Sequence, residues 1–99
     1  MSEATPQRRA AALAYDAEER RARGAPRVVA KGAGFVADEI IERARAAGVP
    51  IHASRELVDL LVQVDLDRQI PPALYVAVAE VLAWVYRLEG RAAAHNEGR

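Results

Sequence analysis

The sequence predicts a small α/β domain in which helices surround a central sheet of about three strands. Short runs rich in valine, isoleucine and alanine alternate with segments whose apolar residues recur at helical spacing, and glycine or proline separates them. The chain has 99 residues, of which 52% are hydrophobic and 28% are charged. This composition is typical of one globular domain, and the length leaves no room for a second core.

Charge and residue content exclude several classes of function. Fourteen basic side chains balance fourteen acidic ones, so the formal net charge is zero. A whole-molecule field that attracts nucleic acid is therefore absent, and we expect no nucleic-acid partner. The sequence has no cysteine, which excludes a disulfide framework and a thiolate nucleophile. Because it also has no signal peptide and no apolar run of about 18 residues, we expect a cytoplasmic location without direct membrane insertion.

The first expected strands lie on either side of a polar connection. The composition of residues 10–14 favours a helix, and propensity alone predicts a helix over residues 7–23. A sheet of only two strands would be small, however, so "AALAY", residues 11–15, can instead serve as a third strand. The pattern leaves both possibilities open. Residues 16–26, "DAEERRARGAP", are typical of an exposed loop. The following "RVVA", residues 27–30, predicts a short buried strand.

A helix over residues 34–47 is predicted next, followed by a strand near 50–53. Gly48 occupies the position of a left-handed residue after the helix end, and Pro50 prevents continuation. The sequence "VPIHA" then has the composition of a buried strand. Since a helix connects this strand to the one before it, we expect the two strands to be parallel.

Two further helices are predicted near residues 55–64 and 72–88. Ser54 can cap the first of them, and leucines recur along it at helical spacing. Ile70 precedes a proline and is therefore biased toward extended backbone, whereas Pro72 suits a first helical turn. Both helices present an apolar stripe that predicts burial against the sheet.

The stretch "GAGFVA", residues 32–37, matches the loose G-x-G-x-x-(G/A) pattern between a predicted strand and a predicted helix. Small residues there allow a pyrophosphate to approach backbone N–H groups, and Lys31 adds positive charge. No acidic residue ends the next strand to hold a ribose, and the chain is too short for a full dinucleotide fold. A small nucleotide-binding sensor domain is the alternative function. The structural alternative is a tight turn with close helix packing.

The remaining polar residues predict no metal, cofactor or catalytic centre. His52 and His95 are the only histidines in the sequence, and neither has a second ligand at suitable spacing. Ser54 is poorly placed for proton transfer to His52, because the two are i and i+2 neighbours. Asp65 and Asp67 lie in a polar connection and are expected to be solvated.

Four stretches carry a resemblance to a known family: the opening "LAYD", "APRVVAKGAG", "VPIHA" and "QVDLDRQIPPALYVAVAEVLAWVYRLEG". In this order they resemble the cytoplasmic domain of the FlhB/YscU family of type III (flagellar) export switch proteins, over about residues 5–90. The resemblance implies a central sheet wrapped by helices and makes "RAAALAY" a strand. We expect residues 1–8 to be a flexible N-terminus, 9–89 the domain and 90–99 a disordered tail.

The resemblance also bears on catalysis. In that family the strand is preceded by Asn-Pro-Thr-His, whose Asn side chain cyclises on its own carbonyl and cuts the chain before Pro. Here Thr5, Pro6, Gln7 and Arg8 stand in its place. A threonine has no amide nitrogen that can close a succinimide ring, so we expect no self-cleavage and no enzyme. The membrane-embedded half of full-length members is also missing, which suggests a free-standing FlhB-like protein.

A docking surface is the second property that the resemblance implies. By this resemblance, the domain binds export substrates through an Ala-Pro pair and through an Ala and a Leu of the last helix. The matching residues are Ala25, Pro26, Ala79 and Leu82. Small apolar groups can form a shallow groove for one apolar anchor. The alternative is that Leu82 is simply core.

These observations predict a non-catalytic component or adaptor of flagellar or type III protein export. The expected partners are export substrates of the rod or hook class, and also the export gate or the membrane-embedded part of a full-length family member. The expected location is cytoplasmic, peripheral at the inner-membrane export apparatus.

Overall fold

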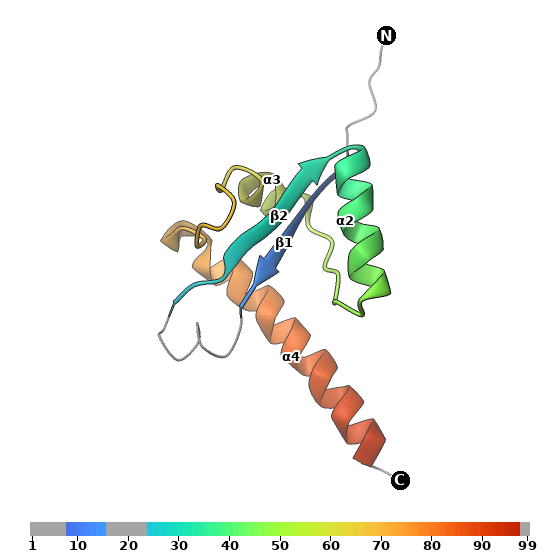
Figure 1. The fold of residues 1–99 in the computed structure, drawn as a ribbon. Coiled ribbons are helices and arrows are strands. Elements are labelled where there is room, and N and C mark those ends of the chain that lie inside the picture. The colour runs from blue at the N-terminus through green and yellow to red at the C-terminus, as the bar shows by residue number, and fades with distance from the viewer. Residues whose placement is uncertain (1–7, 16–23, 98–99) are drawn as a thin grey trace.

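A computed structural model describes residues 8–15 and 24–97, with side chains of the last helix described as far as residue 90 (Figure 1). The predicted α/β class is confirmed. The predictions made for residues 1–7, 16–23 and 98–99 lie outside the described residues. The elements in chain order are β1 (Arg9–Ala14), β2 (Arg27–Ala33), α2 (Phe35–Ala46), α3 (Arg55–Leu61), the 3₁₀ turn η1 (Pro72–Leu74) and α4 (Tyr75–Glu97).

The sheet consists of β1 and β2, which pair antiparallel. Arg9 lies opposite Ala33 and Ala12 opposite Ala30, and an irregularity follows because Leu13 lies opposite Val28. The strand at the opening segment, which the family resemblance predicted against helix propensity, is thus confirmed. Pairing with β2 outweighs the modest intrinsic preference of alanine for helix.

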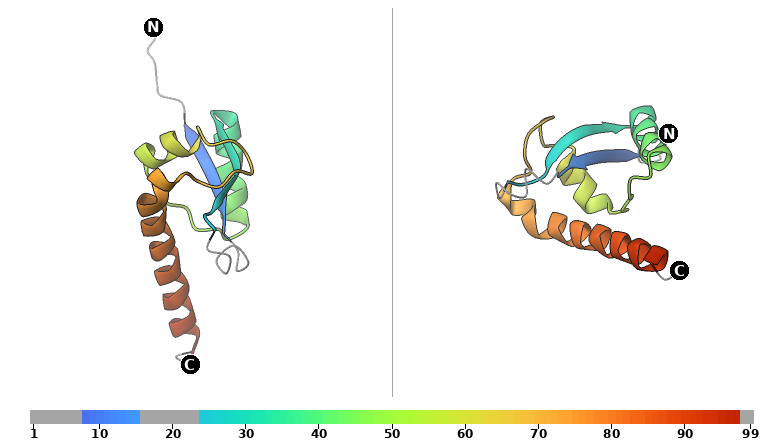
Figure 2. Two further views of the ribbon diagram at one scale, coloured as in Figure 1. Left: turned by 90° about the vertical axis from the view of Figure 1, so that its left-hand side faces the viewer. Right: turned by 60° about the horizontal axis from the view of Figure 1, so that its bottom comes forward.

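Helices cover both faces of this sheet (Figure 2). α2 packs against β1 and β2 and buries Ala37 completely. On the other face, Ala11 and Leu13 of β1 pack against the main core together with residues of α3 and α4. Alternation of side chains along the strand explains this division, because successive residues point to opposite faces.

The expected third strand near residues 50–53 is wrong. The segment that links α2 to α3 forms no strand, and among the described residues the sheet has two strands rather than three. Within the described residues, residues 50–53 make no backbone hydrogen bond. The sequence has strand-like composition here, but composition cannot form a strand without a neighbour to supply the ladder. The expected parallel pairing with β2 is therefore wrong as well.

The predicted stop of α2 is confirmed. Gly48 adopts a left-handed backbone with φ of 75°, and its N–H donates to the carbonyl of Arg45. The N–H of Val49 donates to the carbonyl of Ala44 at 2.8 Å. These bonds satisfy carbonyl groups that the helix end leaves without partners.

The later helices differ from expectation at their ends. α3 is capped by Ser54, whose hydroxyl accepts from the N–H of Leu57 at 3.3 Å, as predicted. It ends at Leu61, earlier than expected. α4 instead continues to Glu97, past the expected end near residue 88. Alanine and arginine in this stretch have high helix propensity, which explains the extension.

The main core lies where β2, α3 and the start of α4 meet. Val28 and Val78 are the largest fully buried side chains in the described part of the chain. The core cluster consists of Ala25, Val28, Leu61, Ile70, Leu74 and Val78. Several partly buried side chains pack around it, Leu57 and Leu82 among them. Burial of such side chains is the dominant favourable contribution to folding.

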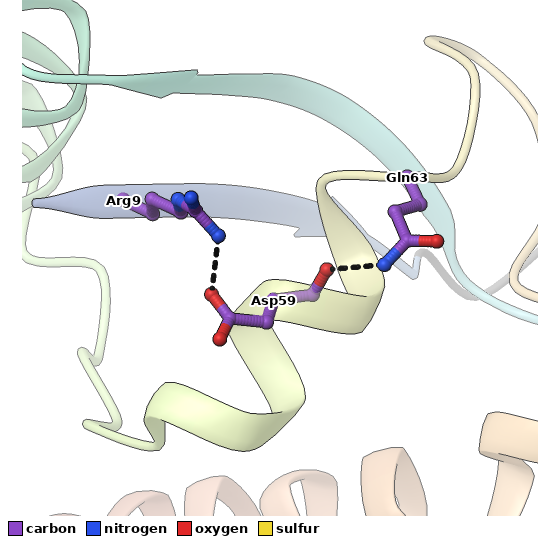
Figure 3. A network of polar contacts seen from close by, with 3 residues as sticks. All are labelled: Arg9, Asp59 and Gln63. Carbon is purple, nitrogen blue, oxygen red and sulfur yellow. Dashed lines mark hydrogen bonds and ion pairs between the residues drawn. The ribbon is translucent and has the colours of Figure 1, made fainter. Parts of the chain in front are cut away.

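Two polar contacts connect α3 to the sheet. The guanidinium of Arg9 lies 2.9 Å from the carboxylate of Asp59, whose carbonyl accepts from the side chain of Gln63 at 3.1 Å (Figure 3). The ammonium of Lys31 on β2 donates to the carbonyls of Val62 and Val64, at 2.9 and 2.8 Å. Lys31 thereby satisfies carbonyl groups at the C-terminal end of α3, where positive charge is favourable.

Candidate functional site

The residues at the position of the family's cleavage motif are described only in part. Thr5, Pro6 and Gln7 lie outside the described residues. Arg8 is described, and its guanidinium lies 3.0 Å from the carboxylate of Asp38 on α2. Its carbonyl accepts from the N–H of Gly34 at 2.8 Å. The last motif position is therefore held at the start of α2 by one backbone bond and one exposed ion pair.

The Ala-Pro pair is buried. Ala25 is 8% exposed and belongs to the main core cluster. Pro26 is also buried, and its carbonyl accepts from the N–H of Ile70 at 2.9 Å. A proline has no N–H to satisfy, which suits a residue that enters a strand from an edge. The pair thus lies at the core to which η1 and α4 contribute Leu74 and Val78.

The two residues of α4 differ in exposure. Ala79 is exposed, whereas Leu82 is half-buried and packs against the core cluster that contains Ala25. Residues three apart in a helix share one face, so Ala79 and Leu82 lie on the same side of α4. The structure therefore brings Ala25 and Leu82 to one cluster and leaves Ala79 at the surface. This contact is compatible both with a groove at Leu82 and with the alternative that this leucine is simply core.

Two open hollows lie elsewhere, along α2. Their volumes are about 400 and 460 Å³. Both are lined by Phe35 and Asp38, and the second also by Glu42. Phe35 is 93% exposed. No motif in the sequence marks Phe35 as functional, although its place beside the apolar face of the helix, at the first helical position, indicates an exposed side chain. Neither hollow is lined by the four docking residues.

The "GAGFVA" stretch makes the tight turn of the structural alternative. Gly34 precedes α2 with a left-handed φ of 61°. Gly32 lies against Val36, because a Cβ atom added at Gly32 would be 2.7 Å from the Cβ of Val36. Lys31, which could have supplied charge for a phosphate, instead binds the carbonyls of Val62 and Val64. Nothing in this geometry supports the nucleotide-binding alternative.

The other polar residues considered in the sequence, where described, contact neighbouring side chains of the fold. The ring of His52 packs against that of Trp84 on α4, with centroids 5.3 Å apart and planes tilted by 58°, whereas the side chain of His95 is not among those described. Asp67 has a left-handed φ of 65° and lies 3.9 Å from Arg27. Among the described residues, no group of three or more His, Cys, Asp or Glu side chains is arranged to hold a metal ion. In the same part of the chain, no helix combines the length and apolarity needed to cross a bilayer.

Comparison with known proteins shows extensive similarity. The model of the family described as FlhB HrpN YscU SpaS matches residues 4–85. Uncharacterized protein YlqH of Bacillus subtilis (strain 168) is 49% identical over 89 residues, which cover 90% of this chain and 92% of YlqH. Flagellar biosynthetic protein FlhB of Escherichia coli (strain K12) is 46% identical over 79 residues. Hypersensitivity response secretion protein HrcU of Ralstonia nicotianae is 42% identical over 80 residues.

The coverage of these relatives is unequal. The aligned residues are 79% of this chain but only 20% of the Escherichia coli FlhB. For HrcU the corresponding shares are 81% and 22%. The similarity to FlhB and HrcU therefore concerns about a fifth of each of those proteins, whereas the similarity to YlqH extends over almost its whole length. Because the family model covers most of the sequence, the chain belongs to the FlhB HrpN YscU SpaS family.

Proposed function

We propose that this chain is a non-catalytic adaptor of flagellar or type III protein export, which binds export substrates at the α4 surface around Ala79 and Leu82. Family membership supports a role related to export in general, since relatives are named for flagellar biosynthesis and secretion. The observation that carries the finer proposal is the pairing on α4 of an exposed small residue with a half-buried leucine.

Such a surface suits weak, selective binding. An exposed alanine lets a partner approach the helix backbone closely, and the neighbouring leucine offers an apolar contact that is already ordered by the core. Ala25 belongs to the same core cluster and its neighbour Pro26 is buried beside it, so this pair supports the surface rather than contacting the partner directly. Substrates of the rod or hook class are the proposed partners, and the export gate or the membrane-embedded part of a full-length relative is the proposed place of assembly.

The substitution Ala79→Asp is expected to reduce substrate recovery at least tenfold without unfolding the domain. The carboxylate would place a charge beside the apolar contact, where burial by a partner is costly. The measurement is a pull-down of purified rod or hook substrates with the wild type and the variant. Ala77→Asp is the matched control, because Ala77 is also exposed on α4 but two residues away, on another face. Equal recovery by all three proteins would refute the proposed surface.

The chain is expected to remain uncut at the motif position. Thr5 cannot form the cyclic imide that the resemblance assigns to asparagine, so no covalent route to cleavage before Pro6 is available to this side chain. The intact mass should stay constant during storage at neutral pH. A family domain that contains Asn-Pro-Thr-His, incubated in parallel, provides the positive control. A mass lower by residues 1–5 would show that the chain cleaves itself after all.

A further inference from the structure

The outer edge of β1 has backbone groups without partners. The N–H of Gly34 donates to the carbonyl of Arg8, which places residue 8 in a hydrogen-bonded pair of the ladder. Such pairs alternate along antiparallel strands, so Ala10 and Ala12 also point their N–H and carbonyl groups toward β2. Arg9 and Ala11 must then point theirs away from β2.

Leu13 continues this pattern beyond the irregularity. It lies opposite Val28, whose N–H and carbonyl bind Arg68 and Asp67 on the far side of β2, at 3.0 and 2.7 Å. The Leu13–Val28 pair is therefore not hydrogen-bonded, and the backbone groups of Leu13 also face outward. Among the described residues, no backbone hydrogen bond reaches Arg9, Ala11 or Leu13 from that side.

Among the residues described, the opposite edge of the sheet, along β2, is covered by another segment of the chain, unlike the edge of β1. Residues 67–70 run along β2, where Gln69 bridges to Arg27 and the N–H of Ile70 donates to Pro26. An open edge strand is a template for another strand, and proteins usually protect it with proline, with charge or with a covering segment. β1, with the sequence "RAAALA", carries no proline, and its one charge is at the first residue.

The segment beyond this edge is the one that was expected to be a strand. In Figures 1 and 2 the connection from α2 to α3 passes on the side of β1 that faces away from β2. Residues 50–53 of this connection have strand composition but no backbone partner among the described residues. Val49 and Ile51 are 52% and 39% exposed. An open strand edge and an unpaired strand-like segment thus lie on the same side of the sheet.

We propose that the open edge of β1 accepts one extended segment of a second polypeptide as an added strand. Three residues of β1 offer outward N–H and carbonyl groups, which a partner backbone can match by β-augmentation. The connection at residues 49–54 lies on the same side, so the site accommodates a single strand rather than another whole sheet. The added strand would also give residues 50–53 the neighbour that their sequence requires.

The packing around β1 defines the chemistry of the partner. α2 and α3 both pack against β1, and they lie on opposite sides of the sheet (Figure 2). A strand between two helix layers is buried on both faces, and such strands are continuously apolar and rich in β-branched residues. Since β1 contributes mainly alanine, the partner has room for larger side chains. The expected partner segment is therefore about five residues of valine, isoleucine or threonine, without proline or internal charge.

Amide hydrogen exchange followed by NMR tests the open edge in the full chain. The amide protons of Arg9 and Ala11 are expected to exchange at least tenfold faster than those of Ala10 and Ala12, which bind β2. Slow exchange at Arg9 and Ala11 in dilute protein would show that the chain covers its own edge. Protection that appears only as protein concentration rises would assign the edge to a second copy. Either result overturns the proposal.

A synthetic peptide, Lys-Thr-Val-Ile-Val-Thr-Lys, serves as the strand probe. At millimolar concentration it should slow exchange at Arg9 and Ala11 at least tenfold, and the same peptide with alternate amides N-methylated should not. Ala11→Pro should fold and lose the effect, since that N–H points outward and proline is tolerated on such edges. The N-methylated peptide keeps the test valid if this variant does not fold. Unchanged exchange with the unmodified peptide overturns the proposal.

Discussion

Gly32→Ala is expected to lower the free energy of unfolding by about 1–3 kcal/mol, the range typical of overpacked sites. The new methyl group would overlap the Cγ1 of Val36 and lie 2.7 Å from its Cβ. Rotation about χ1 cannot remove the second contact, because the Cβ atom is fixed to the helix backbone. β2 and α2 must therefore move apart. For a domain of this size, we expect the melting temperature to fall by roughly 10 °C.

A second substitution separates this clash from other effects of losing glycine. Val36 is 54% exposed, so Val36→Ala alone should change stability little. Combined with Gly32→Ala, it removes the γ carbons and should restore part of the lost stability. Thermal and urea unfolding of the four proteins gives the coupling energy between the two positions. The contact with the Cβ atom remains in the double variant, so additive effects of the two substitutions would mean that the γ carbons of Val36 take no part in the clash.

Lys31→Met is expected to cost about 1.5–3 kcal/mol, the contribution typical of hydrogen bonds from a charged group. Methionine keeps most of the aliphatic stem but cannot donate to the carbonyls of Val62 and Val64. These carbonyls lie just after α3, so the loss should also loosen the packing of that helix on β2. Urea unfolding measures the change in stability.

Arg43→Met provides the matched control for the loss of a cation. Its guanidinium lies 3.0 Å from Glu39, but both side chains are largely exposed, at 80% and 62%. An exposed pair at this spacing contributes about 0.3–0.5 kcal/mol, so the control should stay close to the wild type. If Lys31→Met were no more destabilising than Arg43→Met, the two carbonyls would be satisfied by water at no cost.

Local signals were sufficient to predict several elements. The stop of α2 follows from Gly48 and Pro50, and the start of α3 follows from Ser54, because each depends on the backbone bonds of a single turn. β1 is different. Its alanines favour helix, and only the family resemblance indicated a strand. β1 forms because it pairs with β2, and the composition of residues 9–14 alone does not indicate this partner.

Contacts between distant residues explain what could not be predicted. The contact between Lys31 and the end of α3 joins residues about thirty positions apart, so no local pattern indicates it. The expected strand at residues 50–53 failed because strand composition does not specify where its neighbour comes from. Among the proposed docking residues, the apolar stripe of the last helix allowed for contact of Leu82 with the core. The burial of Ala25 and Pro26 could not be predicted, because it depends on where residues 70–78 pack.

The closed edge of β2 also bears on how the chain can fold during synthesis. Pro26 and Val28 bind Ile70, Arg68 and Asp67, which the ribosome adds about forty residues later. Until then, the first half of the chain holds a hairpin and a helix without the core that stabilises them, and a two-stranded hairpin is marginal alone. Cooperative folding therefore requires that the second half of the chain has been synthesised. A nascent chain that ends before residue 67 cannot complete the core and stays accessible to chaperones and proteases.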